Sequence, residues 1–187
     1  PLGSFLQQKC LPFLYREMEK RGWAMTPYVN SEGETPDEGI YGFPDNPRYS
    51  TGYAAVHNVI GFMPETHMLK PFKDRVQSTY EFMRVVIDFL RTDGQEIAML
   101  KKAADEAVAT KTTFSLDWKV DKSKVEKFAF KGYEAKYKPS EVSGQPRLYY
   151  DRSAPYTKEI NYWNEYVPNT SVEKPYAYII PQAYDHV

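Results

Sequence analysis

The residues with the clearest chemical potential lie between positions 48 and 68. Glu65 follows a short apolar run at 59–63 and one proline, a pattern typical of a buried strand that carries a carboxylate to a sheet edge. In open α/β sheets, ligands bind beyond the carboxyl ends of the strands, so Glu65 is the first candidate for acid–base chemistry. Upstream, Arg48, Tyr49 and Tyr53 offer a guanidinium and two phenols, which suit a substrate-binding loop or a solvated turn equally well.

Catalysis by Glu65 needs a partner, and the chain offers three histidines, His57, His67 and His186. No histidine has a glutamate at the spacing of the zinc motifs, and there is no Gly-x-Ser-x-Gly elbow and no glycine-rich phosphate loop. His67 is expected to be a hydrogen-bonded structural residue. The single cysteine, Cys10, lies among apolar residues and is expected to be a buried thiol. The residues alone therefore predict an isolated carboxylate and no metal site.

Charge and hydropathy narrow the classes of partner. The 187 residues carry a net charge of −1 without a clustered basic excess, which argues against binding of a nucleic-acid backbone. No apolar run approaches the roughly 20 residues of a membrane helix. Aromatic residues make up 16% of the chain, which suits a thick core or a surface that stacks on peptides or sugars.

The N-terminal part of the chain combines one helix and one long loop. Residues 1–4 (Pro-Leu-Gly-Ser) are interpreted as the scar of a cleaved fusion tag. From Phe5 the apolar residues recur at helical spacing, with a kink or a restart expected at Pro12 and an end at Gly22. Prolines and glycines are dense from 23 to 53, so a long binding loop is predicted there, with one short strand at 23–29.

The rest of the chain predicts two helices followed by strands. One helix begins near Lys70 and ends near Gly94, and a second runs from about Ile97 to Val108. The expected core face of the first helix contains Val76, Tyr80, Met83, Val86, Ile87 and Leu90. Alternating aromatic and β-branched residues predict strands at 113–120, 125–137, 147–150 and 176–181. We therefore expect an α/β fold, divided into an α/β part at 5–111 and a β-rich module at 112–187.

Two segments resemble a known enzyme family. Residues 48–53 (Arg-Tyr-Ser-Thr-Gly-Tyr) and 61–71 (Gly-Phe-Met-Pro-Glu-Thr-His-Met-Leu-Lys-Pro) resemble the zinc carboxypeptidases of the carboxypeptidase A type, in particular large bacterial members. The segments 131–134 and 138–142 look like the extension that follows the peptidase domain in those proteins. The resemblance implies that the chain is the C-terminal part of a mixed-sheet peptidase domain followed by its extension.

The family resemblance also implies roles for the candidate residues. In such enzymes, a glutamate on a late strand takes a proton from a metal-bound water and passes it to the departing amine, and motif position assigns this role to Glu65. Arginines and a mobile tyrosine bind the peptide substrate, which implies binding roles for Arg48 and for Tyr49 or Tyr53. A secreted or cell-envelope location of the parent protein is implied by the resemblance alone.

This chain departs from the family in one respect: it contains neither the His-x-x-Glu motif nor the later histidine that bind zinc. We therefore expect zinc in the full-length parent, and expect this polypeptide alone to bind no catalytic zinc and to hydrolyse no peptide. Loss of half of such a sheet exposes an apolar edge, so self-association is also expected. The alternative is a non-catalytic module whose aromatic surface binds peptide or glycan, with Glu65 purely structural.

Overall fold

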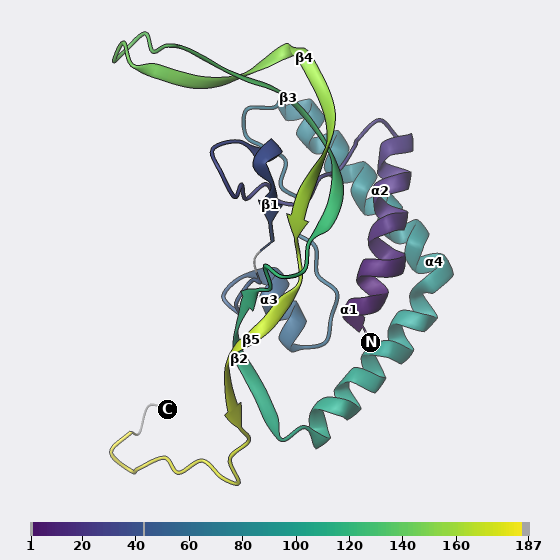
Figure 1. The fold of residues 1–187 in the computed structure, drawn as a ribbon. Coiled ribbons are helices and arrows are strands. Elements are labelled where there is room, and N and C mark those ends of the chain that lie inside the picture. Colours follow the sequence, from purple (N-terminus) through teal and green to yellow (C-terminus); the bar gives the residue numbers. More distant parts are fainter. Residues whose placement is uncertain (1, 43, 185–187) are drawn as a thin grey trace.

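An α/β fold with mixed parallel and antiparallel strands is formed by residues 2–42 and 44–184, the part of the chain that the computed structural model describes (Figure 1). In chain order its elements are α1 (Leu2–Phe5), the π-helical turn η1 (Leu6–Cys10), α2 (Leu11–Lys20), the 3-10 turn η2 (Pro36–Glu38), β1 (Ile40–Tyr41), α3 (Ser50–Val56), α4 (Phe72–Thr110), β2 (Thr113–Val120), β3 (Glu126–Pro139), β4 (Pro146–Trp163) and β5 (Tyr166–Glu173).

The N-terminal helix restarts at Pro12, as the sequence predicts. Pro12 occupies the first turn of α2, where a missing N–H leaves no broken hydrogen bond. The preceding turn, η1, is a π-helix, a local widening that accommodates the change. Gly22 ends the helix with a φ of 79°, a left-handed conformation that glycine adopts without strain.

The two helices expected on either side of Gly94 are a single helix, so that prediction was wrong. α4 runs without a break through 39 residues. A helical glycine costs about 1 kcal/mol relative to alanine, and this cost is offset by packing beyond it. Ile97 lies against the same apolar cluster as the earlier part of α4. Lys9 forms ion pairs of 2.6 Å with Asp93 and with Glu96, one on each side of Gly94.

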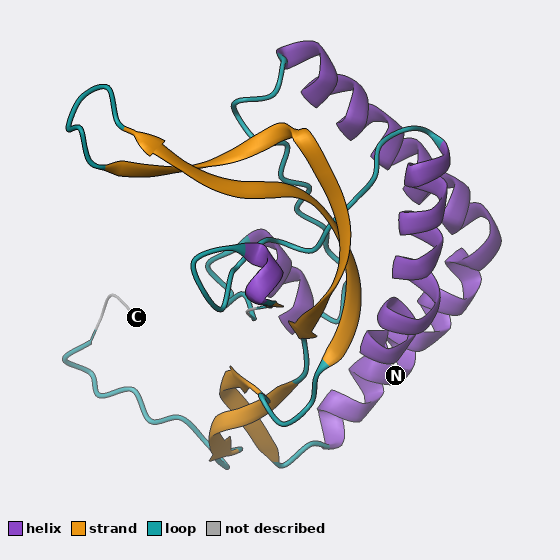
Figure 2. Ribbon diagram, turned by 45° about the horizontal axis from the view of Figure 1, so that its top comes forward, coloured by secondary structure: helices purple, strands orange, loops and turns teal. Residues whose placement is uncertain are grey.

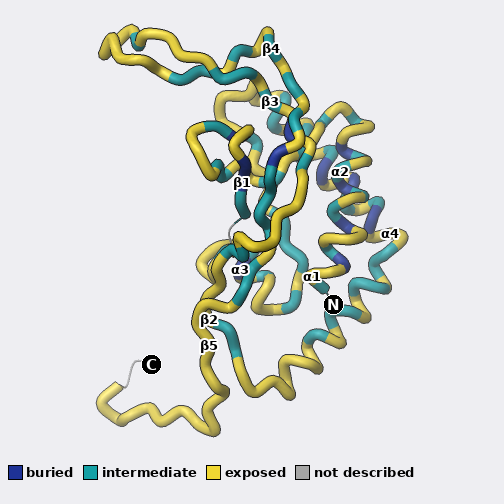
Figure 3. Tube along the Cα trace, viewed as in Figure 1, coloured by how far each residue is buried: buried dark blue, intermediate teal, exposed yellow. Residues whose placement is uncertain are grey.

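The main core lies between α4 and the N-terminal helix. Leu14 of α2 and Val85 of α4 are fully buried, with Phe82 and Phe89 beside them. Figure 3 shows this buried seam where α2 faces α4. Apolar burial of this kind is the main stabilising contribution to such a contact.

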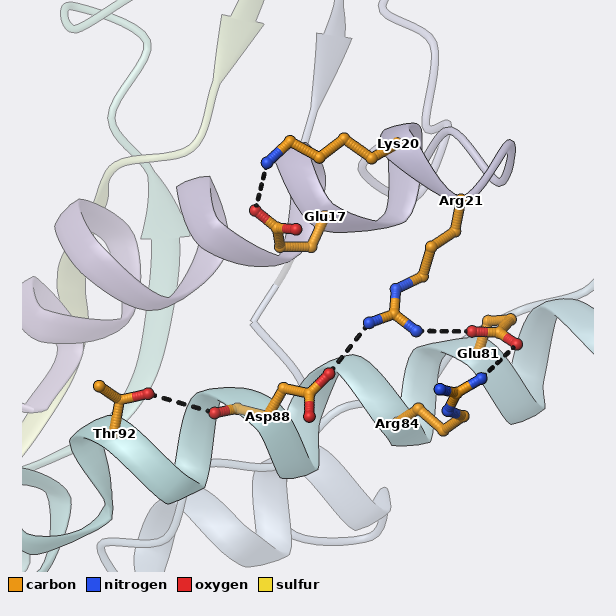
Figure 4. A network of polar contacts seen from close by, with 7 residues as sticks. All are labelled: Glu17, Lys20, Arg21, Glu81, Arg84, Asp88 and Thr92. Atoms are coloured by element: carbon orange, nitrogen blue, oxygen red, sulfur yellow. Dashed lines mark hydrogen bonds and ion pairs between the residues drawn. The ribbon is translucent and has the colours of Figure 1, made fainter.

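Charged side chains border the same contact (Figure 4). The guanidinium of Arg21, just after α2, donates at 2.8 Å to Glu81 and at 2.9 Å to Asp88. Arg84 also donates to Glu81, at 3.2 Å. Hydrogen bonding to Arg21 is the main cause that lowers the pKa of the Glu81 carboxyl below its ordinary value. The acidic side chains of α4 at these positions are thus turned toward α2 and paired there.

The predicted core face of the helix that follows Lys70 was also wrong. The stripe expected in the core lies largely in solvent, because the buried face is the one that carries Phe82, Val85 and Phe89. Periodicity reveals an apolar face but not what covers it, and α4 has two such faces. Val76, Tyr80, Met83, Ile87 and Leu90 are exposed, with accessible fractions between 46% and 57%. Val86 alone of the predicted stripe packs against the buried cluster, and Phe72, at 73%, extends the exposed face.

Two sheets contain the strands, as Figure 2 shows. β3 and β4 pair antiparallel, and the short β1 pairs parallel with β4, with Ile40 opposite Tyr162. The β3–β4 register shifts at a bulge after Tyr133, whose partner is Pro155, while the next residue faces Asp151. β2 and β5 form a separate antiparallel pair. The strands predicted at 113–120, 125–137 and 147–150 are confirmed, the last as part of the longer β4.

A second, smaller core ties the sheet to the helices. Ile40, Phe130 and Ile160 are buried together, and the ring of Tyr15 on α2 meets that of Phe128 on β3 edge to face at 6.2 Å. Because β1 comes from the N-terminal part, the pairing of Ile40 with β4 joins residues on both sides of position 111. The helices α2 and α4 thus lie along one side of the β3–β4 ribbon (Figure 1).

Two short strands predicted from composition were wrong. Residues 23–29 are not a strand, and Pro27 within them lacks the N–H that a strand ladder requires. Residues 176–181 have strand-like side chains, but they form an exposed segment with no described strand beside it. A strand needs a hydrogen-bonding neighbour, which side-chain type does not supply. None of the described helices is long and apolar enough to cross a membrane.

Candidate functional site

The segment that carries Glu65 is anchored by apolar side chains, although not as a strand. Residues 59–67 form no ladder, so the strand predicted there was wrong. Instead, Ile60 and Phe62 pack on the helical core, and the ring of Phe62 meets that of Phe82 on α4 nearly perpendicularly at 5.6 Å. The apolar run is therefore explained by packing on α4. Glu65 follows it into solvent and is exposed.

The predicted binding loop at residues 48–53 enters a helix. α3 begins at Ser50, with Tyr49 as its extended N-cap residue. The amide of Arg48 donates to Asn46 Oδ1 at 3.0 Å, which fixes the turn before the helix. Gly52 is buried against the carbonyl of Asn46, so a side chain there would collide with backbone. The position of α3 is thus set by close backbone contact.

The three proposed binding residues all present their side chains to solvent. Arg48 is exposed, and Tyr49 and Tyr53 are 50% and 59% accessible. The Tyr53 ring lies 4.6 Å from that of His57, one helical turn later on α3. The region around α3 therefore carries exposed aromatic side chains and one exposed cation.

Gly61 brings the Glu65 segment and α3 together. A Cβ added at Gly61 would stand 3.0 Å from Ala54 Cβ and 3.4 Å from Thr51 Cα. The chain also turns back on α3 directly, since the amide of Val59 donates to the Ala54 carbonyl at 2.9 Å. Asn58, at a φ of 53°, makes this turn and donates its side-chain amide to Asp105 on α4 at 2.8 Å. The segment is therefore fixed to both helices upstream of Glu65.

The candidate residues share this region without direct contact. Within 2–42 and 44–184, no hydrogen bond or ion pair joins the Glu65 carboxylate to another side chain. Arg48, Tyr49 and Tyr53 likewise form no side-chain hydrogen bond among themselves in the described part of the chain. Glu65 is thus a free carboxylate on an anchored segment.

His67 has the structural role expected of it. Its Nδ1 accepts a hydrogen bond of 3.2 Å from the amide of Leu69 and so closes a turn before α4. His57 packs against Tyr53, and His186 lies outside the described residues. Among residues 2–42 and 44–184, no three His, Cys, Asp or Glu side chains are grouped to hold a metal ion. These residues therefore do not fit a zinc centre.

A hollow beside the Glu65 segment was not predicted from the sequence. It has a volume of about 420 Å³ and is open to solvent. Thr66, the neighbour of Glu65, forms one wall, and the start of α4 forms the rest through Phe72, Arg75, Val76, Thr79, Tyr80 and Met83. Arg75 is the charged residue among those that line it.

Arg75 in this hollow has an unusual environment. Its Nε is buried and has no acceptor among the described residues, while its guanidinium lies 5.5 Å from the centre of the Phe72 ring. A buried donor without an acceptor is energetically costly.

No family model, curated protein or solved structure matches the chain.

Proposed function

We propose that the chain is the C-terminal part of a zinc-dependent carboxypeptidase-like protein, to which it contributes the general base Glu65. The observation that carries this proposal is an unpaired carboxylate that follows an anchored segment. Glu65 is exposed and free of hydrogen bonds to other described side chains, and it follows a segment held by Gly61 against α3 and by Phe62 against α4. A base needs both a free oxygen and a fixed position.

The proposed chemistry is peptide-bond hydrolysis. The Glu65 carboxylate takes a proton from a water molecule as the water oxygen bonds to the peptide carbonyl carbon. The protonated Glu65 then gives that proton to the departing amine as the carbon–nitrogen bond breaks, and it returns to its ionised state. Such proton transfer contributes about 10²- to 10⁴-fold to the rate in known enzymes. The described residues form no zinc site, so the metal ligands of the proposed enzyme would come from other parts of the parent.

Peptide binding is proposed for the α3 end of the same region. Arg48 offers a planar guanidinium that matches a carboxylate in two hydrogen bonds, and Tyr49 and Tyr53 offer exposed rings. Because Gly61 packs on Ala54 and Thr51, the segment that leads to Glu65 is held against the helix that carries Tyr53. Substrate binding and proton transfer would thus be positioned by the same contact.

A non-catalytic module that binds peptide or glycan is the second candidate. It is favoured by one specific observation, the exposure of Tyr49 and Tyr53 beside each other at the start of α3. Exposed aromatic rings are common in surfaces that stack on sugars and peptides. In this reading Glu65 has no chemical role.

Assays of the purified chain test whether the zinc ligands lie elsewhere in the parent protein. The catalytic proposal expects no stoichiometric zinc by elemental analysis and no release of C-terminal residues from a peptide substrate. Bound zinc together with hydrolysis that disappears in Glu65→Gln would contradict it.

Titration of the chain with the same peptide separates the two candidates. The binding module is supported if Tyr53→Ala abolishes peptide binding while Glu65→Gln leaves it unchanged. It also requires that Glu65→Gln does not alter the activity of the parent protein. Tyr184→Ala, at an exposed tyrosine remote from α3 in sequence, is the matched control.

A further inference from the structure

The exposed stripe of α4 is an unusual surface for a helix that already buries another face. Six large apolar side chains, Phe72, Val76, Tyr80, Met83, Ile87 and Leu90, follow one another at intervals of three or four residues. The row extends for about 27 Å along the helix. With side chains about half exposed, it presents roughly 600 Å² of apolar surface, the upper end for patches on monomeric proteins. Patches of this size mark interaction sites.

Cations border this stripe. Lys73, Arg84 and Arg91 are spaced by about three and two helical turns, which places them along one edge. The Arg84 guanidinium lies 5.9 Å from the ring of Tyr80, which confirms that this edge adjoins the stripe. On the other edge, Arg75 lies against Phe72. Lys73 and Arg91 take part in no ion pair within the described residues.

The acidic residues of α4 are directed elsewhere. Glu81 and Asp88 pair with Arg21, and Asp93 pairs with Lys9, so these carboxylates are neutralised by the N-terminal helices. Figure 4 shows Glu81 and Asp88 turned toward Arg21. The helix therefore separates its charges, with acids on the side of α2 and cations beside the exposed stripe.

We propose that the outward face of α4 binds an amphipathic helix of a partner protein, one with an apolar stripe and acidic edges. The apolar partner residues would lie along Phe72 to Leu90, and partner carboxylates would pair with Lys73 and Arg91. The hollow of about 420 Å³ at the start of α4 receives one apolar side chain. Helix-in-groove recognition has this pattern of anchors at intervals of three and four residues.

A second copy of the chain and a membrane surface fit the exposed stripe of α4 less well than an acidic helix does. In a pair of two copies, one basic edge would meet another, and like charges placed together are unfavourable. A membrane surface would accept the cations, but it offers no single side chain that fills the hollow at the start of α4. The charge pattern therefore favours an acidic helix.

Labelled synthetic helices test the proposal. One peptide of about 18 residues carries leucines at intervals of three and four residues with flanking glutamates, and its control replaces every glutamate by lysine. Fluorescence anisotropy is expected to show at least about tenfold tighter binding of the glutamate peptide, with a difference that shrinks at high salt. Equal affinity for the two peptides would overturn the proposal.

A matched pair of variants locates the binding face. Met83→Glu lies on the stripe and Met99→Glu lies off it on the same helix, and both side chains are already exposed, at 52% and 66%. Met83→Glu is expected to weaken binding of the glutamate peptide by about tenfold or more, and Met99→Glu to change it less than about twofold. Circular dichroism of both variants checks that α4 remains folded. Equal effects of the two variants would contradict the proposed site.

The same proteins test the other occupants. Sedimentation that shows a dilution-resistant dimer, converted to a monomer by Met83→Glu, would overturn the proposal in favour of a second copy. Binding to phosphatidylserine vesicles that Met83→Glu abolishes, with no preference between the peptides, would overturn it in favour of a membrane. A monomer that prefers the glutamate peptide supports the acidic helix.

Discussion

Gly61 lies so close to Ala54 that a methyl group at Gly61 would stand 3.0 Å from Ala54 Cβ. Few real Cβ contacts are this short, so the absence of a side chain at Gly61 permits the Glu65 segment to lie on α3. The backbone of Gly61 does not have a positive φ, so the requirement for glycine is one of space and not of conformation. This contact is what joins the proposed base to the proposed binding residues.

Gly61→Ala is expected to destabilise the fold by about 1–3 kcal/mol, the usual cost of overpacking. Because the collision is with Ala54, the added cost should be smaller in an Ala54→Gly background, even though Ala54→Gly itself weakens α3. Urea unfolding of the four proteins in this cycle measures the coupling. Strictly additive costs would show that the two residues do not press on each other.

Leu14→Ala is expected to lower the free energy of unfolding by about 2–5 kcal/mol, because Leu14 is fully buried between α2 and α4 and the substitution leaves a cavity. The same substitution at Leu116, which is exposed on β2, should cost less than about 0.5 kcal/mol. Thermal or urea unfolding compares them. A similar loss at both positions would mean that the α2–α4 contact is not the main core.

The thiol of Cys10 is expected to resist alkylation in the folded protein. Burial raises its pKa to about 11, with the nearby Asp93 carboxylate as a second cause, so very little thiolate exists near pH 8. Reaction with iodoacetamide followed by mass spectrometry should show modification only after denaturant is added. Rapid modification of the native protein would place Cys10 outside the core.

Tyr15 should make the fold sensitive to alkali. Burial raises its pKa from 10.0 to about 12, so the folded protein keeps a proton that the unfolded chain releases. The unfolded state then binds fewer protons, and stability falls as pH rises from about 10 to about 12. Tyr15→Phe removes this ionisation, so it should lose less stability over that interval than the wild type. Identical alkaline losses in both proteins would contradict the assignment.

Local signals in the sequence predicted part of the fold correctly. The restart at Pro12 depends only on proline chemistry, and the strand at 113–120 depends on alternation that any sheet partner would satisfy. The predicted break at Gly94 failed because Ile97 and the Lys9 ion pairs continue the helix across a residue with weak helix propensity. Tertiary contacts of this kind are not visible in a short window of sequence.

At the candidate site, too, the sequence predicted local features but not long-range contacts. The run before Glu65 was predicted to be a buried strand, but Val59 and Met63 are exposed, and only Ile60 and Phe62 pack on the helical core. Five apolar residues do not distinguish a strand from a segment packed on a helix. The ring of Phe62 contacts that of Phe82 on α4, and through this long-range contact the segment packs on a helix. The stripe from Val76 to Leu90 was taken as core because its spacing is helical, although Phe82, Val85 and Phe89 form the face that α2 covers.

The proposed role of Glu65 is tested most directly by the rate of peptide hydrolysis in the full-length gene product with Glu65→Gln. The glutamine keeps the size of the side chain and removes the base. The account predicts a fall in kcat of about 10²- to 10⁴-fold with unchanged zinc content, and no fall in Glu141→Gln, which alters another exposed glutamate. A Glu65→Gln protein that hydrolyses the peptide at the wild-type rate would contradict the account.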